Sequence, residues 1–530
     1  MKMVKSLLLG SAAGLAALTG AQAADLPMKA KPVEYVKICS LYGARFYYIP
    51  GTDTCIRIGG HIRSEVSINS RGTGGQQWFT SGDGNNSQTR DRDVFFVRNR
   101  VFVNTDTRTQ TSFGTLRTFS VTRFETNTGV GLAGGANTTA IDAGIIQWGG
   151  FTIGRAGTSY FDNPWAYAFK WGAAAGWSGN PDTAGGRFVM AYTHQFGNGI
   201  SGTLSLEDNK VSNQRGKYNG VNALSIVGVG PTLNTQGGNT WPSVVGQLRI
   251  EQAWGGFHIS GEVINNHVAY NCGSASGTTT IAAGGCSELA GNPADKVGGA
   301  VNAAFKFNVP TGVNDALYIG GTYSKGDGGT TWGGVAQGAS MGIYGGGGNG
   351  ITTYGSITGS YVWDSVYTSS AGVTSGAGLT IVGPVGQQLT TGYGGSIAFE
   401  HGWNAEWRTS VFGGAQVVDY NTTANAILCS KFAAGSASGT LTAGAGGANV
   451  SNTSACNWDY RLVSAGTRTY WTPVRDLTIG LELIWTNHHV AMGDSVVYNQ
   501  PTISGFKPNA AYIVRDQNIF SGMFSVRRFF

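Results

Sequence analysis

Beyond residue 23 the sequence has no uninterrupted apolar run of the roughly 20 residues that a membrane-spanning helix needs, so helical membrane spans are excluded. It is also poor in charge, because Asp, Glu, Lys and Arg make up 12% of the chain, about half the usual share for a globular protein. Proline is scarce at 13 residues, whereas glycine is abundant at 85. This composition fits a β-barrel whose strands are apolar on alternate residues. It fits a secreted β-helix or adhesin equally well.

The chain also lacks the residue patterns of common hydrolytic and metal-dependent enzymes. It has seven histidines, and none shows the spacing of a zinc site. In a strand, the neighbours His488 and His489 would point to opposite faces, which disfavours a shared metal ion. There is no G-x-S-x-G motif and no pair of carboxylates with catalytic spacing. We therefore expect a protein that is not an enzyme and that uses no cofactor and no metal.

The N-terminus has the pattern of an export signal. Lys2 and Lys5 precede an apolar run from Leu7 to Leu18, and an A-x-A cleavage site ends at Ala23. Cleavage there would leave 507 residues (530 − 23) with a net charge of +4, from 33 basic and 29 acidic residues. That charge is small and scattered, so we expect no nucleic-acid partner. Residues 1–23 are predicted to be removed during export.

The six cysteines fall into three near pairs along the chain. In an exported protein this spacing suggests three local disulfides that close loops, although six cysteines allow fifteen connectivities. The candidate pairs are Cys39 with Cys55, Cys272 with Cys286, and Cys429 with Cys456.

Apolar and polar residues alternate through much of the chain, most clearly in 56–68, 94–104 and 476–486. In 94–104, for example, valines occupy one face and Arg98 and Arg100 the other. A half-buried soluble sheet would show the same alternation locally. Its repetition along the chain, together with the export signal and a final strand that ends on Phe530, predicts a transmembrane β-barrel.

The connections between these segments alternate between short turns and long polar loops, which is the habit of outer-membrane barrels. Aromatic residues cluster beside the short turns, as expected for an interfacial girdle: Trp254, Phe257, Trp403, Trp407 and Trp471.

Counting strands between the connections gives sixteen, which form a barrel over 55–530 after an N-terminal periplasmic segment at 24–54. The expected strands are 55–69, 92–106, 113–126, 140–148, 151–156, 186–196, 199–208, 243–254, 256–268, 295–309, 315–325, 389–401, 404–420, 459–472, 476–489 and 511–530. The weaker segment 352–364 is assigned to an outer loop. An eighteen-stranded barrel would instead pair it with a strand near 374–383. Strand 113–126 has apolar and basic residues on the same face. This pattern predicts either a β-bulge or a strand face that is partly apolar and partly charged.

Three segments closely resemble the porin family of alphaproteobacterial outer membranes, the rhizobial and Brucella-type porins. They are the mature start ADLP at 24–27, the stretch PVEYVKICSLYGARFYYIPGTDTCIRIGG at 32–60, and IGRAGTSYFD at 153–162. The resemblance covers essentially the full length. It implies an antiparallel sixteen-stranded diffusion porin, a homotrimer, a third outer loop folded into the lumen, and a disulfide between Cys39 and Cys55. Arg528 departs from the apolar or aromatic residue usual at that position.

A sixteen-stranded barrel encloses a wide aqueous channel, so selection among solutes requires a constriction. The candidate is the third loop, 155–186, which carries Asp162, Lys170 and Asp182, with Arg155 as a structural anchor at its entrance. Strand parity places basic residues on the facing wall: Arg57, Arg63, Arg98 and Arg100, with Arg117 and Arg123 less firmly assigned. Acids opposite arginines would create a transverse field, whereas the alternative for any single arginine is a solvated charge without a special role. The sign of the selectivity does not follow from the sequence.

We therefore expect a passive, water-filled channel for small hydrophilic solutes and ions in the bacterial outer membrane. Its expected partners are membrane lipid and lipopolysaccharide, two further copies of the chain, and the outer-membrane assembly machinery, which would recognise the final strand. Two alternatives stay open: a solute-specific channel with aromatic residues along the lumen, and a structural or adhesive barrel that acts through its outer loops.

Overall fold

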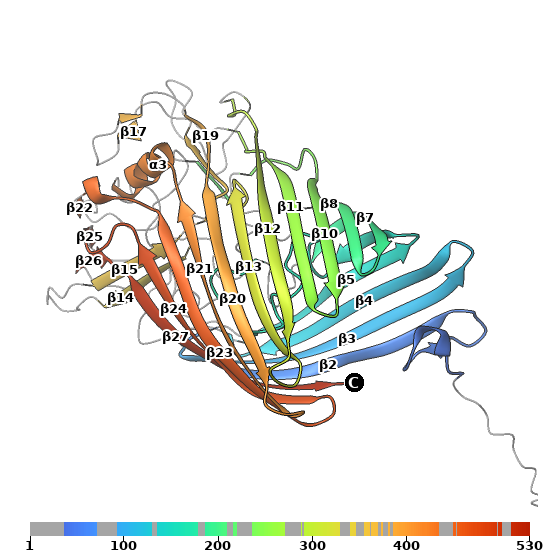
Figure 1. Cartoon of the computed structure of the whole chain (residues 1–530). Coiled ribbons are helices and arrows are strands. Elements are labelled where there is room, and N and C mark those ends of the chain that lie inside the picture. Colours follow the sequence, from blue (N-terminus) through green and yellow to red (C-terminus); the bar gives the residue numbers. More distant parts are fainter. Residues whose placement is uncertain are drawn as a thin grey trace, which may run out of the picture.

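Sixteen antiparallel strands form a closed barrel in the computed structural model (Figure 1). The structure describes residues 37–70, 93–129, 135–178, 186–208, 216–219, 236–270, 288, 291–328, 340–345, 355–360, 362–368, 373–374, 380–381, 385–433, 449–451, 453–495, 497–500 and 510–530. Short turns gather at one end of the barrel, and small sheets and a helix gather at the other (Figure 1). Within the described residues, no helix is long and apolar enough to cross a membrane.

Each barrel strand pairs with the next in the chain, and the last pairs with the first. The strands are β2 (Cys55–Ile68), β3 (Phe95–Thr111), β4 (Gly114–Asn127), β5 (Asn137–Trp148), β6 (Phe151–Ala156), β7 (Arg187–Gly197), β8 (Ile200–Glu207), β10 (Ser243–Gln252), β11 (Gly255–Asn266), β12 (Lys296–Val309), β13 (Asp315–Lys325), β20 (Thr391–Gly402), β21 (Trp407–Asp419), β23 (Tyr460–Val474), β24 (Leu477–Val490) and β27 (Gln517–Phe529). The predicted sixteen-stranded barrel is confirmed.

The seam between β27 and β2 closes the barrel. The backbone N–H of Gly60 donates to the carbonyl of Phe530 at 3.2 Å, and the N–H of Phe530 donates to the carbonyl of Gly60 at 3.1 Å. A Cβ atom on Gly60 would lie 1.9 Å from the carbonyl oxygen of Phe102, and its φ is +157°. Only glycine therefore fits at this point of the seam.

The two faces of the wall differ as the alternation predicts. On β12, Val297, Val301 and Phe305 are exposed on the outside, whereas Asn302 and Ala304 are buried on the lumen side. Near the short turns, Trp403 and Trp407 are exposed, which fits the predicted aromatic girdle.

The largest error in the predicted strand boundaries concerns the last strand, expected at 511–530. Residues 511–514 are not part of it, because β26 (Ala510–Val514) pairs with β25 (Val497–Gln500) in a separate sheet. Between β26 and β27, Asp516 binds the ends of the neighbouring strand: its carboxylate accepts from the N–H of Val490 at 3.0 Å and contacts His489 Nδ1 at 2.7 Å. The polar run at 515–518 marks the break between the two strands.

The segments that suggested eighteen strands lie outside the barrel sheet. The strand β15 (Gly355–Ser360) pairs with β14 (Ser340–Gly345) and β26, while β17 (Val373–Thr374) pairs with β18 (Thr380–Ile381). The assignment of 352–364 to an outer loop is therefore confirmed.

The irregularity predicted in 113–126 is also present. Opposite Val121 and Thr122 of β4, strand β5 carries one additional residue, Asp142, so the bulge lies in the neighbouring strand. On β4 itself the lumen face is mixed, and the Arg117 guanidinium stacks 4.9 Å over the Phe119 ring.

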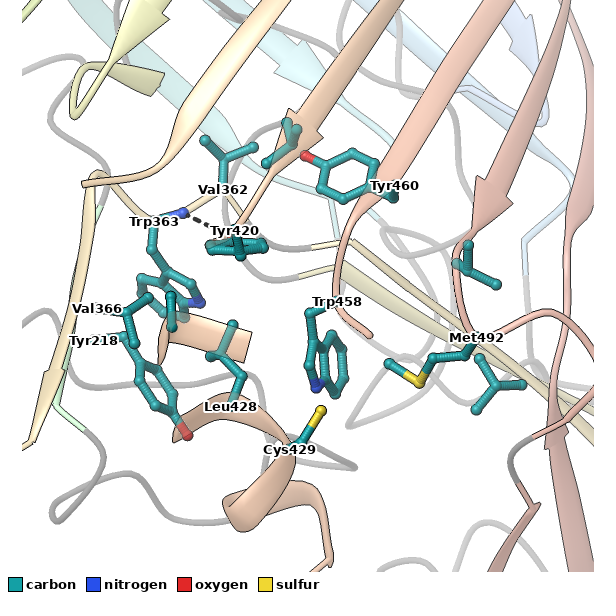
Figure 2. Close-up of a cluster of buried hydrophobic side chains, with 14 of the residues drawn as sticks. Tyr218, Val362, Trp363, Val366, Tyr420, Leu428, Cys429, Trp458, Tyr460 and Met492 are labelled. Atoms are coloured by element: carbon teal, nitrogen blue, oxygen red, sulfur yellow. Dashed lines mark hydrogen bonds between the residues drawn. The ribbon is translucent and has the colours of Figure 1, made fainter. Parts of the chain in front are cut away.

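The outer loops fold around a buried core of their own, here called the outer cap (Figure 2). Its core residues include Tyr218, Val362, Trp363, Val366, Tyr420, Leu428, Trp458, Tyr460 and Met492. Helix α3 (Thr422–Ala433) packs into this core, and the disulfide Cys429–Cys456 ties it to the segment before β23, as predicted. A three-stranded sheet of β9 (Lys217–Asn219), β16 (Ser365–Thr368) and β19 (Val385–Leu389) completes it. Cys272 and Cys286 lie outside the described residues.

At the other end, the N-terminal segment is fixed to the start of the barrel. The short strand β1 (Tyr47–Tyr48) pairs with β2, and the disulfide Cys39–Cys55 encloses the buried ring of Phe46. This disulfide confirms the pairing that the family resemblance implied.

Candidate functional site

Residues 157–178, here called the lumen segment, leave β6 and fold into the barrel instead of extending outward. Side chains on three successive strands hold its beginning. Gln247 of β10 donates to the carbonyl of Tyr160 at 2.8 Å, and Ser260 of β11 and Asn302 of β12 donate to the carbonyl of Phe161 at 2.7 and 3.3 Å. The segment is thereby attached to the lumen face of the wall.

The middle of the lumen segment follows the wall further round. The Asn163 amide donates to the hydroxyl of Tyr318 on β13, and the Trp177 ring stacks on the same tyrosine with centroids 4.6 Å apart. Arg468 of β23 donates to the carbonyl of Ala168 at 2.6 Å. These contacts continue the attachment along β13 and β23.

The tip of the segment is bound to β24. The backbone N–H groups of Trp171 and Gly172 both donate to the Glu482 carboxylate at 2.5 Å. The Ala175 N–H donates to Ser464 of β23 at 3.0 Å. The Arg527 guanidinium of β27 lies 4.4 Å over the Trp171 ring. The lumen segment therefore runs along the wall from β10 to β27, and none of these contacts falls on β2 to β5.

The wall of β27, β2 and β3 carries a row of three arginines, here called the arginine row. Arg63 of β2 lies directly opposite Arg527 of β27 on one side and directly opposite Arg100 of β3 on the other. Like charges in directly opposed positions of a sheet are destabilising. The row therefore requires compensating carboxylates.

Two glutamates and an aspartate supply that compensation. Glu65 lies 2.5 Å from Arg98, 3.1 Å from Arg63 and 3.5 Å from Arg527. Glu125 lies 2.5 Å from Arg100 and 2.9 Å from Arg123, and Asp142 lies 3.2 Å from Arg123. Five arginines against three carboxylates leave an excess of two positive charges (5 − 3).

These arginines are not freely solvated lumen charges. Arg63, Arg98, Arg100 and Arg123 are each 5% exposed, because they lie against the wall in side-by-side ion pairs. Parity placed them correctly on the lumen face. Their partners Glu65, Glu125 and Asp142 escaped sequence analysis, although Glu65 stands two positions from Arg63 on the same face.

Arg57 belongs to a different group. It lies six residues before Arg63 on β2, roughly 20 Å nearer the short turns at the rise of a strand. There it shares the Asp106 carboxylate with Arg108 and Arg117, at 3.6, 3.0 and 2.9 Å. Sequence analysis did not identify Asp106 or Arg108, although the two alternate on one strand face.

The structure places Asp162 at the base of the lumen segment and not beside the arginine row. Its carboxylate accepts from the Ser159 N–H at 3.1 Å and lies half-buried near Arg187 of β7. Burial raises its pKa to about 7. Arg187 opposes that shift, while Glu207 and Glu262 add to it.

Lys170 is buried. Its ammonium donates to the Gly172 carbonyl at 3.0 Å and lies 5.1 Å from the Trp177 ring, and burial lowers its pKa to about 8. Neither Asp162 nor Lys170 therefore faces the arginine row, and Asp182 cannot be placed because it lies outside the described residues.

Two arginines lie at the base of the segment. Arg155, the predicted anchor, stacks 6.0 Å over the Phe188 ring. Arg187 is buried between Glu262 at 2.8 Å and Glu207 at 3.3 Å, and Glu207 in turn accepts from the hydroxyl of Ser159 at 2.7 Å. The sequence offered no signal for Arg187, because the order of the strands alone brings these groups together.

Below the lumen segment, an open cavity of about 540 Å³ lies toward the short turns. Phe169, Lys306, Asp315, Glu400 and Arg408 are among its lining residues, so it is polar and of mixed charge. The described part of the chain holds no group of three or more His, Cys, Asp or Glu side chains that could bind a metal ion. The arrangement is suited to the passage or binding of polar solutes.

Comparison with known proteins agrees with this architecture. Residues 25–523 match the family described as Porin subfamily. The chain is 34% identical over 267 residues to porin Omp2b of Brucella canis, a match that covers 48% of this chain and 63% of the relative. Omp2b of Brucella abortus is 33% identical over the same length and with the same coverage. The chain thus spans just under two thirds of the length of these curated relatives.

Among solved structures, the outer-membrane channel DcaP of Acinetobacter baumannii aligns with a TM-score of 0.49 and 13% identity. That alignment covers 91% of this chain and 99% of DcaP. With a family match that extends over nearly the whole sequence, the chain belongs to the porin family and is a barrel of the bacterial outer membrane.

Proposed function

We propose that this protein is a passive diffusion channel for small hydrophilic solutes and ions, and not an enzyme. The observation that carries the proposal is the ring formed inside the barrel by the lumen segment and the arginine row. The segment covers the wall from β10 to β27, and the row occupies the adjoining wall from β27 to β3. Solutes would cross between them down their own gradients.

The constriction we propose consists of Arg63, Arg98 and Arg100 on the wall and the lumen segment opposite. Asp162 and Lys170 would shape the segment from within, because Lys170 is buried in it and Asp162 binds the backbone at its base. Asp182 is the candidate for an acidic group on the facing side. Rings of charge tune ion preference in channels, so this arrangement would discriminate by charge as well as by size.

Single-channel recording in planar bilayers tests the proposal, with Arg100→Gln compared to wild type. Arg123 still neutralises Glu125 in this variant, so the wall keeps an ion pair. We expect stepwise conductance from both proteins and a reversal potential shifted toward cations in Arg100→Gln. Arg475→Gln is the control, because Arg475 is 86% exposed on the short turn between β23 and β24. An unchanged reversal potential would remove Arg100 from the constriction.

The outer cap supports a second candidate, a structural or adhesive barrel. Loops that only frame a pore need no core, yet these enclose Trp363, Tyr420 and Trp458 and carry a disulfide. Correctly folded protein that gave no conductance would overturn the channel and favour this function. The solute-specific channel finds less support, because the described lumen wall of β2 to β4 is dominated by arginines and carboxylates.

We also propose that the chain acts as a homotrimer. The outward face of β3 and β4 has a polar stretch beside its apolar residues, with a hydrogen bond between Thr105 and Ser120 at 2.5 Å and another between Thr107 and Thr118. Beside them, Ser64 of β2 donates to Asn99 at 2.9 Å. Hydroxyl groups gain nothing from contact with lipid chains, whereas a protein interface accommodates them.

We infer the remaining partners from the position of each surface of the barrel in the outer membrane. The apolar outward faces of β12 and β13 would contact membrane lipid, and the outer cap would contact lipopolysaccharide. The final strand, β27, would be the segment that the assembly machinery recognises after residues 1–23 have directed export.

A further inference from the structure

Three arginines surround one carboxylate near the short-turn end of the lumen, well away from the arginine row. Arg108 and Arg117 each bind Asp106 through two nitrogens, at 2.9–3.0 Å. Arg57 approaches the same carboxylate at 3.6 Å. Three positive charges and one negative charge leave an excess of two (3 − 1). We call this group the Asp106 cluster.

The cluster is accessible, unlike the arginine row. The side chains of Arg57, Arg108 and Arg117 are 43%, 27% and 28% exposed, whereas that of Asp106 is 2% exposed. The carboxylate is therefore enclosed and the guanidinium groups face outward from it. An incoming anion would meet positive charge first.

Aromatic rings hold all three guanidinium groups in place. The Phe46 ring lies 5.1 Å from Arg57 and 4.9 Å from Arg108, and the Phe119 ring lies 4.9 Å from Arg117. Phe46 is itself fixed in the N-terminal segment by the buried disulfide Cys39–Cys55. Stacking occupies the faces of the guanidinium groups, and Asp106 binds one edge each of Arg108 and Arg117. The edge of Arg57 is left for a planar or tetrahedral anion.

The cluster also has unused donors and unrelieved repulsion. Among the described residues, the Arg57 guanidinium donates no hydrogen bond, and its only carboxylate contact is the 3.6 Å approach to Asp106. Arg108 and Arg117 lie directly opposite each other across β3 and β4, a like-charge pair that a single carboxylate compensates incompletely. A bound dianion would supply the two missing charges and accept from the donors of Arg57.

We propose that the Asp106 cluster is a binding site for small dianionic solutes, phosphate or dicarboxylate, at the inner mouth of the barrel. The inference deepens the proposed channel function by naming a solute class at its exit. The proposed site rests on the proposed channel function only because the channel is the route by which solutes would reach the site. Binding itself can be measured on solubilised protein without any conductance.

The test is calorimetric titration of the folded, detergent-solubilised protein with inorganic phosphate and, separately, with succinate, at low ionic strength. We expect saturable binding to wild type, weakened about tenfold or more by Arg57→Gln, since one charge-assisted contact is lost. Arg475→Gln, an exposed arginine at the same end of the barrel, is expected to bind as wild type does. Binding of one anion alone would assign the site to phosphoryl or to carboxylate groups.

Absence of saturable binding of both anions would overturn the inference, as would equal affinity in Arg57→Gln and wild type. Arg108→Gln is the second variant and is expected to weaken binding in the same direction, so the inference does not depend on one protein folding. Conductance recorded on the same preparations separates the two proposals. A conducting wild type that binds neither anion would leave the channel intact and remove only the site.

Discussion

The arginine row places like charges side by side, and each of its residues would destabilise the fold without a carboxylate partner. Arg527, Arg63 and Arg100 occupy directly opposed positions, and they are tolerable only because Glu65 and Glu125 are buried among them. Loss of one partner from a buried ion pair leaves an uncompensated charge and destabilises by about 3–5 kcal/mol. A wall lined by serine and threonine would avoid this sensitivity, so we attribute the arginine row to a role in the lumen.

Asp162 allows a prediction of how stability depends on pH. Burial raises its pKa to about 7, above the ordinary value of 3.8, so the folded protein holds this proton more tightly than the unfolded chain does. The contribution of the protonated group is fully present below pH 4 and is lost as the pH rises to 7. We expect Asp162→Asn to be more heat-resistant than wild type at pH 8, by a few degrees, and nearly equal to it at pH 4.

Electrophoresis after heating, which separates folded barrel from unfolded chain, measures this difference. Among the described residues, the carboxylate accepts a hydrogen bond only from the backbone N–H of Ser159, and an asparagine oxygen can do the same, so the substitution should not disturb the fold. An advantage of the variant that is as large at pH 4 as at pH 8 would contradict the argument.

Among the elements, the lumen segment differs from an ordinary loop because side chains of the barrel strands fix its backbone. The contact with Glu482 is the most concentrated, since one carboxylate accepts two backbone N–H groups at 2.5 Å. Hydrogen bonds to a charged acceptor contribute roughly 1.5–3 kcal/mol each. The tip of the segment is therefore expected to respond strongly to changes at this one position.

We expect Glu482→Gln to loosen the tip while leaving the barrel intact. The amide retains the shape of the carboxylate but offers one acceptor instead of two. Single-channel traces of the variant should show larger current fluctuations than wild type at equal voltage. Glu251→Gln is the matched control, because Glu251 is 55% exposed at the end of β10. Traces as quiet as those of wild type would show that Glu482 does not hold the tip.

Sequence alternation predicted the strands well because it reflects the two environments of a barrel wall. The sixteen strands and the lumen position of Arg98 and Arg100 followed from a period of two residues. The packing of the lumen segment did not follow, because Arg187, Glu207 and Glu262 meet only after the sheet has closed. Asp162 was expected to face the arginines, since its place in the chain does not reveal which way a loop residue turns.

At the scale of the whole molecule, the outer surface of the barrel is not uniform. Most strands present aliphatic and aromatic side chains outward, such as Ile319 and Tyr323 on β13. Part of the outward face of β3 and β4 presents hydroxyl groups that bind one another. A membrane barrel with one polar side is expected to bury that side against other copies of itself.

We therefore expect Thr122→Trp on β4 to weaken the trimer, because a large ring would separate surfaces that small residues allow to approach. Ile319→Trp on β13 is the control, since the same ring would meet only lipid there. Cross-linking of membranes followed by electrophoresis measures the fraction of trimer, which should fall severalfold in the first variant alone. Equal trimer fractions would place the interface elsewhere.

The core of the outer cap has a consequence for how such a protein can evolve. Ala173 and Ala175 of the lumen segment are buried in the same cluster as Tyr218 and Trp458 of the cap. Close-packed interiors transmit displacements from one part to another. Mutations in the core of the outer cap would thus also displace the lumen segment. We expect variation at the outer end of the barrel to be coupled to variation inside its lumen.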